Sequence, residues 1–254
     1  MFIPEPGYDL YALDLDQVEY RIYAHYSKDE NLCRMIKEGH DVHSATASLL
    51  FGVPISEIEK PMRNKAKTIN FGLLYGMGVK ALAENLGMTE TAASQLKSDY
   101  FAALPTAGPF VQNVQRVTRQ RGYIRNLYGR RRRLTPNECF KACNALIQGC
   151  AADYLKHKSV LIYKFLKMNN YKSHLVLWVH DEILIQVAHG EEHILPIVRW
   201  LMSDFTNFRT YITAGIEKCD GSWGKKIDVA DEIGFQELSV DELEVIKNYD
   251  IYAN

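Results

Sequence analysis

The chain has 254 residues, of which 47% are hydrophobic and 24% charged, and its formal net charge is −1 at pH 7. This length can bury a substantial core in one large or two small domains, and the near-neutral charge gives no general sign of a nucleic-acid partner. The five cysteines include no CxxC pair, which argues against a disulfide framework or a zinc ribbon. No apolar run is long enough to span a membrane, so we expect a soluble cytoplasmic protein without a membrane partner.

The N-terminal part is predicted to contain one strand followed by helices. Tyr8–Asp16 has the apolar centre of a buried strand and ends in carboxylates. From about Gln17 to Arg125 the pattern favours helices, and Thr89 is a predicted N-cap. Breaks are expected near Gly39, Gly52–Pro54, Gly76–Gly78, Gly87 and Pro105.

One of these helices carries an unusual ridge. Pro61 suits the start of a helix, and Arg63, Lys67, Phe71 and Tyr75 then recur every four residues. Two cations near a helix N-terminus followed by two aromatic rings match a triphosphate attached to a flat base. Taken alone, the spacing is equally compatible with an ordinary surface helix.

The C-terminal part is predicted to alternate between helices and strands. Gly129–Pro136 is a basic connector, Cys139–Met168 a helix, and two apolar runs, His174–Val179 and Ile183–Val187, flank a polar turn as in a β-hairpin. A helix is expected over Glu191–Asp204, a strand over Thr210–Ile216, and a capping box at Ser239–Glu242 opens a helix reaching Tyr252. Arginines crowd one segment and suggest a track for a phosphate backbone: Arg116, Arg119, Arg121, Arg125 and Arg130–Arg133.

Two acids stand where predicted strands end. Asp14 ends the first strand, and Asp181 lies at the tip of the hairpin. Strands of one sheet can bring such groups together, and two close carboxylates repel each other unless a cation lies between them. Two Mg²⁺ ions held by carboxylates can assist an in-line phosphoryl displacement.

Three motifs in this order resemble family A DNA polymerases, the polymerase-I-like group that includes many phage enzymes. Asp14–Arg21 resembles the first palm motif, the helix with Arg63 resembles the fingers motif, and Val179–Glu182 resembles the last palm motif. Gly39–His43, Gly129–Arg131 and Gln148–Asp153 are similar to intervening family segments. The resemblance covers about residues 1–224.

The resemblance implies roles for individual residues. Asp14, Asp181 and the Leu15 carbonyl would bind the metal ions, and Glu182 would be an accessory catalytic acid. Lys67 would protonate the departing pyrophosphate, and Glu19 would exclude a 2′-hydroxyl. The remaining dNTP contacts would come from His43, Arg63, Lys67, Phe71 and Tyr75. Contacts to primer–template DNA would come from Arg21, Arg130, Asn144, Gln148 and His180.

The resemblance also implies an α+β fold with an antiparallel palm sheet and a helical fingers subdomain. Residues 1–16 would be palm, 17–128 mainly fingers, 129–226 palm again, and 227–254 an acidic tail that is either solvated or docks on a partner. Because the chain starts shortly before the first palm motif, we expect the thumb and exonuclease domains to be absent. The chain would then be half of a split polymerase, with a second polypeptide carrying the thumb and remaining palm, or a fragment.

Two local departures from the family pattern concern charge. Asp16 stands where a small polar residue is usual, and it would either join the metal site or add negative charge. Asn64 replaces a common second arginine. The expected activity is DNA-directed DNA polymerisation. A single-subunit RNA polymerase, disfavoured by Glu19, and a non-catalytic DNA-binding or assembly subunit remain as alternatives.

Overall fold

The structure is a computed structural model that describes residues 2–251, with the side chain of Leu49 excepted. The chain divides into two compact units, which are described separately. Unit 1 combines the described parts of Met1–Val18 and Ala151–Asn254, and unit 2 is the continuous segment Glu19–Cys150. Unit 1 is therefore assembled from both ends of the chain.

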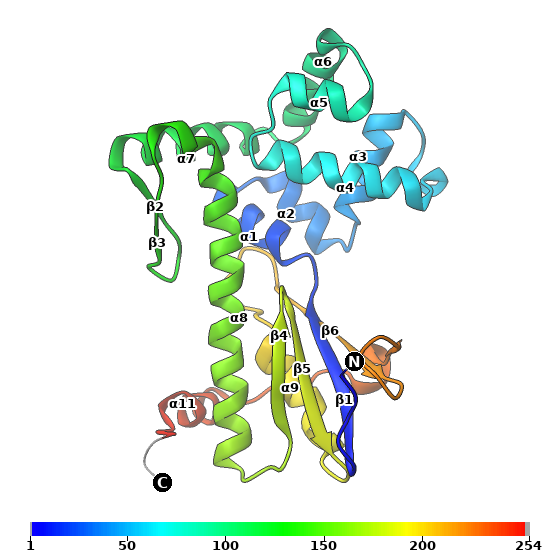
Figure 1. Ribbon diagram of the computed structural model, residues 1–254, viewed down its shortest axis with the longest axis vertical. Helices are drawn as coiled ribbons and strands as arrows, with labels where there is room; N and C mark the ends of the chain where they lie inside the picture. Colours follow the sequence, from blue (N-terminus) through cyan, green and yellow to red (C-terminus); the bar gives the residue numbers. More distant parts are fainter. Residues whose placement is uncertain (1, 252–254) are drawn as a thin grey trace. The chain divides into compact units, whose positions relative to one another are not determined.

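Unit 1 is built on a five-stranded antiparallel sheet (Figure 1). Its strands are β1 (Tyr8–Leu15), β4 (His174–Val179), β5 (Glu182–Ala188), β6 (Ala214–Cys219) and β7 (Lys226–Asp228), in the spatial order β4-β5-β1-β6-β7. The N-terminal strand thus lies between two strands from the C-terminal part. Most of β5 and the centre of β1 are buried, whereas Asp14 near the end of β1 is exposed.

Helices complete unit 1. The 27-residue helix α8 (Ala142–Met168) crosses the boundary between the units, and its later part belongs to unit 1. The others are α9 (Leu195–Met202), α10 (Ala230–Ile233), α11 (Val240–Asn248) and the 3₁₀ helix η3 (Glu192–Ile194). Arg199 of α9 is buried, and its guanidinium donates to the carbonyl oxygens of Ala214, Ala230 and Gly234. This buried cation is therefore satisfied by backbone acceptors and holds the C-terminal segment against the sheet.

Unit 2 is mainly helical. Its elements are α1 (Val18–Ser27), α2 (Glu30–Lys37), α3 (Val42–Phe51), η1 (Ile55–Glu57), α4 (Lys60–Leu74), α5 (Val79–Leu86), α6 (Glu90–Ala103), α7 (Ala107–Arg121), β2 (Tyr123–Arg125), β3 (Arg131–Arg133), η2 (Pro136–Lys141) and the start of α8. Asp29, Asp41 and Thr89 each accept a backbone N–H at a helix start, as N-caps do.

The structure confirms most expected elements. The first strand, the hairpin, the helix that begins around Pro61, the Thr89 cap and the Ser239 capping box are all present. Tyr252, the last residue of the expected tail helix, lies outside the described residues. Cys139, Cys143 and Cys150 are buried, as expected of small core residues.

Other boundaries were wrong. The expected helix over Glu191–Asp204 is a 3₁₀ turn followed by α9, which ends at Met202. The strand expected over Thr210–Ile216 begins only at Ala214 and continues to Cys219, because this stretch pairs with β1. The helical pattern expected to reach Arg125 ends at Arg121, since Gly122 adopts a left-handed conformation with φ 73°.

The short hairpin of β2 and β3 was not predicted. Its second strand consists of three exposed arginines, a sequence without strand signal. The Asn126 side chain closes the turn by accepting from the backbone N–H groups of Tyr128 and Arg130, and the Arg131 guanidinium lies 5.1 Å from the Tyr123 ring centroid. These contacts of the Asn126, Tyr123 and Arg131 side chains, not strand propensity, account for the hairpin.

Candidate active site

Strand register brings the predicted catalytic acids of unit 1 to one end of the sheet. β1 pairs with β5 so that Asp14 lies opposite Glu182. The backbone N–H of Leu15 donates to the carbonyl oxygen of Asp181, with an N–O distance of 3.2 Å. Two pairs of neighbouring residues thus meet at the end of β1: Asp14 with Leu15, and Asp181 with Glu182. The two pairs are 166 or more residues apart in the sequence.

A two-residue turn presents Asp181. Val179 pairs with Glu182, which leaves His180 and Asp181 as the tip of the β4–β5 hairpin. His180 has φ 56°, a left-handed conformation that is uncommon outside glycine. Its side chain is exposed. The tight turn and the hydrogen bond from Leu15 hold the Asp181 backbone against the end of β1.

The acids perturb one another. Partial desolvation and then the negative charges of Asp181, Glu182 and Asp16, in that order, together raise the pKa of Asp14 to about 6. Lys226 opposes this shift. Like charges are therefore concentrated at this end of the sheet, which is the electrostatic condition that favours binding of a cation.

Glu182 is occupied by neighbours from the C-terminal part. Trp223 donates its indole N–H to Glu182 Oε1 at 2.6 Å, and Lys226 of β7 forms an ion pair with the other carboxylate oxygen. Lys226 also lies 3.2 Å from Glu217. Glu182 is therefore oriented by two donors, whereas Asp14 and Asp181 have no such cation paired with them among the described residues.

Asp16 does not lie on a strand. β1 ends at Leu15, and the Asp16 carboxylate accepts a hydrogen bond of 2.7 Å from the Thr213 hydroxyl, while its backbone N–H donates to the Thr213 carbonyl. Of the two expectations for Asp16, added negative charge is supported by its effect on the pKa of Asp14.

In unit 2, α4 carries the predicted nucleotide-binding ridge. Lys67 is exposed, and the side chains of Arg63, Phe71 and Tyr75 are partly exposed. The helix ends at Leu74 and Tyr75 is its C-cap residue. The opposite face, with Ala66, Ile69, Leu73 and Leu74, is buried in the core of the unit. The cations are thus available to solvent and the helix is anchored by its apolar face.

The aromatic end of the ridge is ordered by stacking. The Phe71 and Tyr75 rings are stacked with centroids 5.9 Å apart, and Tyr20 of α1 lies 5.1 Å from the Phe71 ring. The Tyr75 hydroxyl donates to a Glu19 carboxylate oxygen. Glu19 from the first palm motif therefore forms one cluster in unit 2 with Phe71 and Tyr75 from the fingers motif.

His43 lies behind this cluster. It is 3% exposed, and its ring packs against Tyr20 and Phe71. Burial lowers the pKa of His43 to about 4, aided by the charges of Arg63 and Lys67 and opposed by Asp41. His43 is therefore neutral at physiological pH, and its Nδ1 lies 3.3 Å from the Asn70 side-chain nitrogen. A direct triphosphate contact by His43 remains a prediction that requires the ring to become exposed.

Arg63 is engaged by a carboxylate. Asp41, the N-cap of α3, accepts from Arg63 Nε with one oxygen and from Nη2 with the other, the latter at 3.1 Å. Burial favours a raised pKa for Asp41, but the hydrogen bonds from Arg63 and Ser44 and the Arg63 charge lower it to about 2. The carboxylate is therefore ionised at neutral pH.

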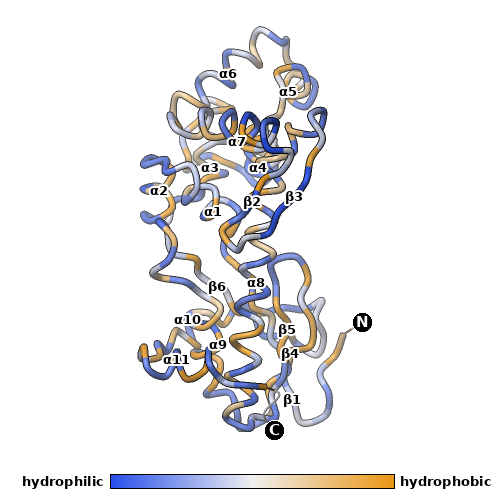
Figure 2. The backbone as a smooth tube through the Cα atoms, turned by 90° about the vertical axis from the view of Figure 1, so that its left-hand side faces the viewer, coloured by the Kyte–Doolittle hydropathy of each residue, from blue (hydrophilic) through white to orange (hydrophobic). Residues whose placement is uncertain are grey.

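The predicted DNA-contact residues are spread over both units. In unit 2, Arg130 and Gln148 are exposed, Arg21 is half-buried, and the buried Asn144 Oδ1 has no hydrogen-bond partner within the described part of the chain. Strand β3, blue in the hydropathy view of Figure 2, continues a set of exposed cations. That set comprises Arg116, Arg119, Arg121, Arg125 and Arg130–Arg133.

The family follows from comparison with known proteins. Residues 1–224 match the model described as DNA polymerase family A, which is well over half of the chain. The chain belongs to DNA polymerase family A. It is 36% identical to DNA polymerase I of Caldicellulosiruptor bescii over 205 residues, covering 77% of this chain and 24% of that protein. It is 37% identical to DNA polymerase I of Chloroflexus aurantiacus over 209 residues, covering 79% and 22%.

A solved structure supports the same family. The fold matches the POL domain of Pol1 from M. smegmatis, in complex with DNA primer-template and dNTP, with a TM-score of 0.82 and 31% identity. The match covers 87% of this chain and 41% of that one. The present family A chain thus spans less than a quarter of the two curated relatives and less than half of this structural neighbour.

The acids of unit 1 fit the magnesium that family A polymerases use. Mg²⁺ is commonly held by one or two carboxylates together with substrate phosphates, and Asp14 and Asp181 supply such a pair. Within residues 2–251 no three His, Cys, Asp or Glu side chains are grouped closely enough to form a metal site of their own. The raised pKa of Asp14 is the observation that favours a cation here. Among the described helices, none is both long and apolar enough to cross a membrane.

Three side chains in these clusters were not among the predicted site residues. Trp223 and Lys226 reach Glu182 from about 40 residues further along the chain, and no local pattern indicates such a contact. Asp41 was noted only as part of a family segment. Its N-cap position was visible in the sequence, but its pairing with Arg63 depends on how α3 packs against α4.

Proposed function

We propose that this chain carries the catalytic residues of a template-directed DNA polymerase. The reaction is attack of a primer 3′-hydroxyl on the α-phosphate of a dNTP, with pyrophosphate leaving. The proposal is carried by one observation: in a family A chain, the β1–β5 register brings Asp14 beside Asp181 at the end of a sheet. In this proposal residues 1–16 and 129–226 are palm and residues 17–128 are mainly fingers.

In this proposal each cluster has its own task. Asp14, Asp181 and the Leu15 carbonyl hold two Mg²⁺ ions, which when bound stabilise charge on the attacking and leaving oxygens. Arg63 and Lys67, one turn apart on α4, bind the triphosphate as cations, and Lys67 protonates the pyrophosphate. Phe71 lies against the sugar and base, and Glu19, oriented by the Tyr75 hydroxyl, rejects a 2′-hydroxyl.

The proposed partners are primer–template DNA and protein outside the present residues. The exposed arginines from Arg116 to Arg133 suit a phosphate backbone, and we propose further contacts to primer–template DNA from Arg21, Asn144, Gln148 and His180. We propose that thumb and remaining palm contacts to the duplex come from protein outside the present residues, either a second polypeptide or the rest of a longer chain.

The test is primer extension by the full chain, alone and with any co-purifying protein. Asp181→Ala should reduce nucleotide addition to background, because one of two metal-binding carboxylates is lost. Asp9→Asn, at the opposite end of β1, is the matched control and should retain addition. Primer extension by Asp181→Ala at the wild-type rate contradicts the proposal. Robust extension by the isolated chain contradicts the need for a partner.

The same assay separates the alternative functions. With Glu19 in place, dNTPs should be incorporated in strong preference to rNTPs, whereas a single-subunit RNA polymerase gives the opposite preference. Glu19→Ala should reduce the preference by about 10- to 100-fold, the scale on which one small group in a pocket discriminates. A non-catalytic DNA-binding subunit shows no addition with any nucleotide, with or without its partner.

A further inference from the structure

Asp41 performs two tasks with one carboxylate. As the N-cap of α3 it accepts from the backbone N–H of His43 at 3.2 Å, and it also accepts from the Ser44 hydroxyl at 2.6 Å. The same two oxygens accept a two-point hydrogen bond from Arg63 of α4. The carboxylate is thus anchored to α3 and in turn anchors a side chain of the neighbouring helix.

The contact leaves most of the Arg63 guanidinium available. Asp41 takes one N–H from Nε and one from Nη2, so three of the five N–H donors of the planar group point away from the carboxylate. The Arg63 side chain is 39% exposed, and it makes no other hydrogen bond within residues 2–251. Because a guanidinium is rigid and planar, fixing one edge also fixes the direction of the other.

Charge around this edge favours an anion. Lys67 lies one turn further along α4, is exposed, and acts with Arg63 to lower the pKa of His43. Asp41 stays ionised, so the ion pair persists at neutral pH. The remaining edge of Arg63 and the Lys67 ammonium are therefore two cationic donors on α4, and the direction of the Arg63 edge depends on Asp41 of the α3 N-terminus.

We propose that Asp41 is a positioning residue for triphosphate recognition, holding the Arg63 guanidinium so that its remaining N–H groups face the phosphates of the incoming nucleotide. This inference rests on the proposed function, in which Arg63 binds the triphosphate. A rival role has the opposite sign: Asp41 as an internal anion that competes with the nucleotide for Arg63.

The test compares dGTP binding to the full 254-residue chain and its Asp41→Asn variant, with Mg²⁺, by equilibrium dialysis. Asparagine is also a good N-cap and has nearly the same shape, so α3 is retained while the ion pair is lost. If Asp41 positions Arg63, the Kd of Asp41→Asn for dGTP should be about 10-fold higher than that of wild type. This is the scale of one charge-assisted hydrogen bond. A lower Kd identifies Asp41 as a competitor, and an unchanged Kd identifies a structural cap only; either overturns the proposal.

Two further variants make the result specific. Ser44→Ala removes one hydrogen bond to Asp41 but leaves the ion pair, so its Kd should match wild type. In an Arg63→Ala background, Asp41→Asn should have no further effect, since the two residues act as one unit. An equal effect of Asp41→Asn with and without Arg63 overturns the proposal.

The outcomes for Arg63→Ala and wild type separate this proposal from the proposed function. If Arg63→Ala weakens dGTP binding and Asp41→Asn does not, only the role of Asp41 is overturned. If Arg63→Ala binds dGTP as well as wild type, or wild type does not bind dGTP, the proposed nucleotide site on α4 is overturned together with the role of Asp41.

Discussion

Asp14 shows what crowding of like charges does to a single residue. Free aspartate has a pKa of about 3.9, whereas burial and then the neighbouring acids raise the pKa of Asp14 to about 6. At pH values between these two pKa values, the Asp14 carboxyl is mostly ionised in the unfolded chain and mostly protonated in the folded chain. The free energy of unfolding therefore falls as pH rises from about 4 to 6, and the loss persists at higher pH.

Replacing Asp14 by asparagine should therefore stabilise the protein. In EDTA at pH 7.5, Asp14→Asn should raise the free energy of unfolding by on the order of 1 kcal/mol, a value below the full pKa shift because the side chain is partly screened by water. At pH 4 the gain should vanish. Urea denaturation at both pH values measures this, and a gain of equal size at both contradicts the electrostatic explanation.

Asp9→Asn is the matched control. Asp9 lies on the same strand, but its carboxylate accepts from the Lys218 ammonium at 2.7 Å, so a cation is paired with it. Its replacement should give no stabilisation at pH 7.5. Mg²⁺ should then stabilise wild type more than Asp14→Asn, because a ligand stabilises only a state that binds it.

At the scale of single elements, the end of α4 is determined by backbone hydrogen bonds. Met77 N–H donates to the Gly72 carbonyl at 2.7 Å and Gly76 N–H to the Leu73 carbonyl at 3.1 Å, the two bonds of a Schellman motif. Gly76 has φ 92°, as the residue after the cap requires. Gly72 lets the Met77 side chain lie against the helix, since a Cβ there would be 2.2 Å from Met77 Cε.

Gly76→Ala should therefore destabilise unit 2. The left-handed conformation costs alanine about 1 kcal/mol, and its Cβ would lie 2.8 Å from Gln115 Nε2. We expect the midpoint temperature of thermal unfolding, Tm, to fall by several degrees. Gly149→Ala is the control, because Gly149 lies within α8 of unit 2, has no positive φ, and an added Cβ would meet only Asn126 Nδ2 at an ordinary 3.8 Å. Equal effects of the two substitutions contradict this explanation of the helix end.

Whether an element could be predicted from the sequence depends on whether its signal is local. The helix of Arg63 and the hairpin of Asp181 were predictable, because their periodicity and turn signals are local. The β2–β3 hairpin was not, since contacts of Asn126 and Tyr123 outweigh the poor strand propensity of three arginines. Likewise, that Glu19 and Tyr75 contact each other depends on how α1 packs near α4, which no local pattern encodes.

At the scale of the whole chain, unit 1 joins residues that are far apart in the sequence. A shared sheet was expected from the two acids, but the placement of β1 between β5 and β6 was not, because strand order is a property of tertiary packing. The segment after Gly224 lies outside the family match, yet β7 pairs with β6 and brings Lys226 to Glu182. The C-terminal segment is thus part of the sheet that carries the acids.

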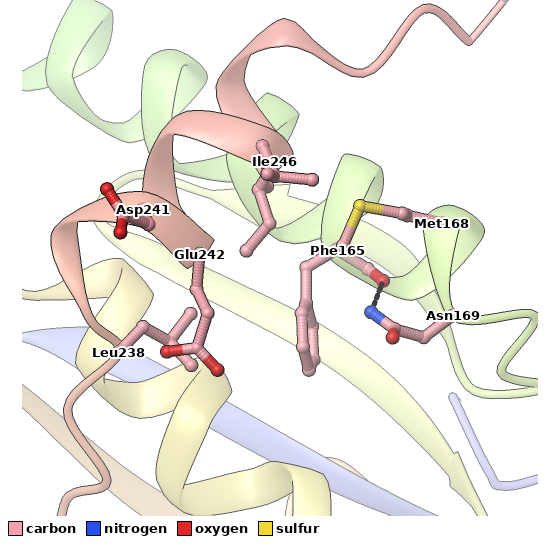
Figure 3. Close-up of a pocket in the computed structure, with 8 residues that line it drawn as sticks. Phe165, Met168, Asn169, Leu238, Asp241, Glu242 and Ile246 are labelled. Carbon is pink, nitrogen blue, oxygen red and sulfur yellow. Dashed lines mark hydrogen bonds between the residues drawn. The ribbon is translucent and has the colours of Figure 1, made fainter.

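Helix α11 extends this packing to α8. The two helices line a cavity of about 360 Å³ with Phe165 and Met168 on one side and Leu238 and Ile246 on the other (Figure 3). Lys164 of α8 donates to the Lys247 carbonyl at 2.6 Å, which places a cation at the C-terminal end of α11. Of the two expectations for the acidic tail, a free solvated segment does not apply to this helix.

Two neighbouring aliphatic residues test whether α11 is held by burial. Ile246 is 2% exposed and Val245 is 58% exposed. Ile246→Ala removes buried apolar atoms from the contact with α8 and should cost about 2–4 kcal/mol of docking free energy, whereas Val245→Ala should cost little. Because a terminal helix can detach without global unfolding, amide hydrogen exchange over residues 239–249 is the measurement. Faster exchange in Ile246→Ala alone is expected, and equal exchange in both variants means that Ile246 does not anchor α11.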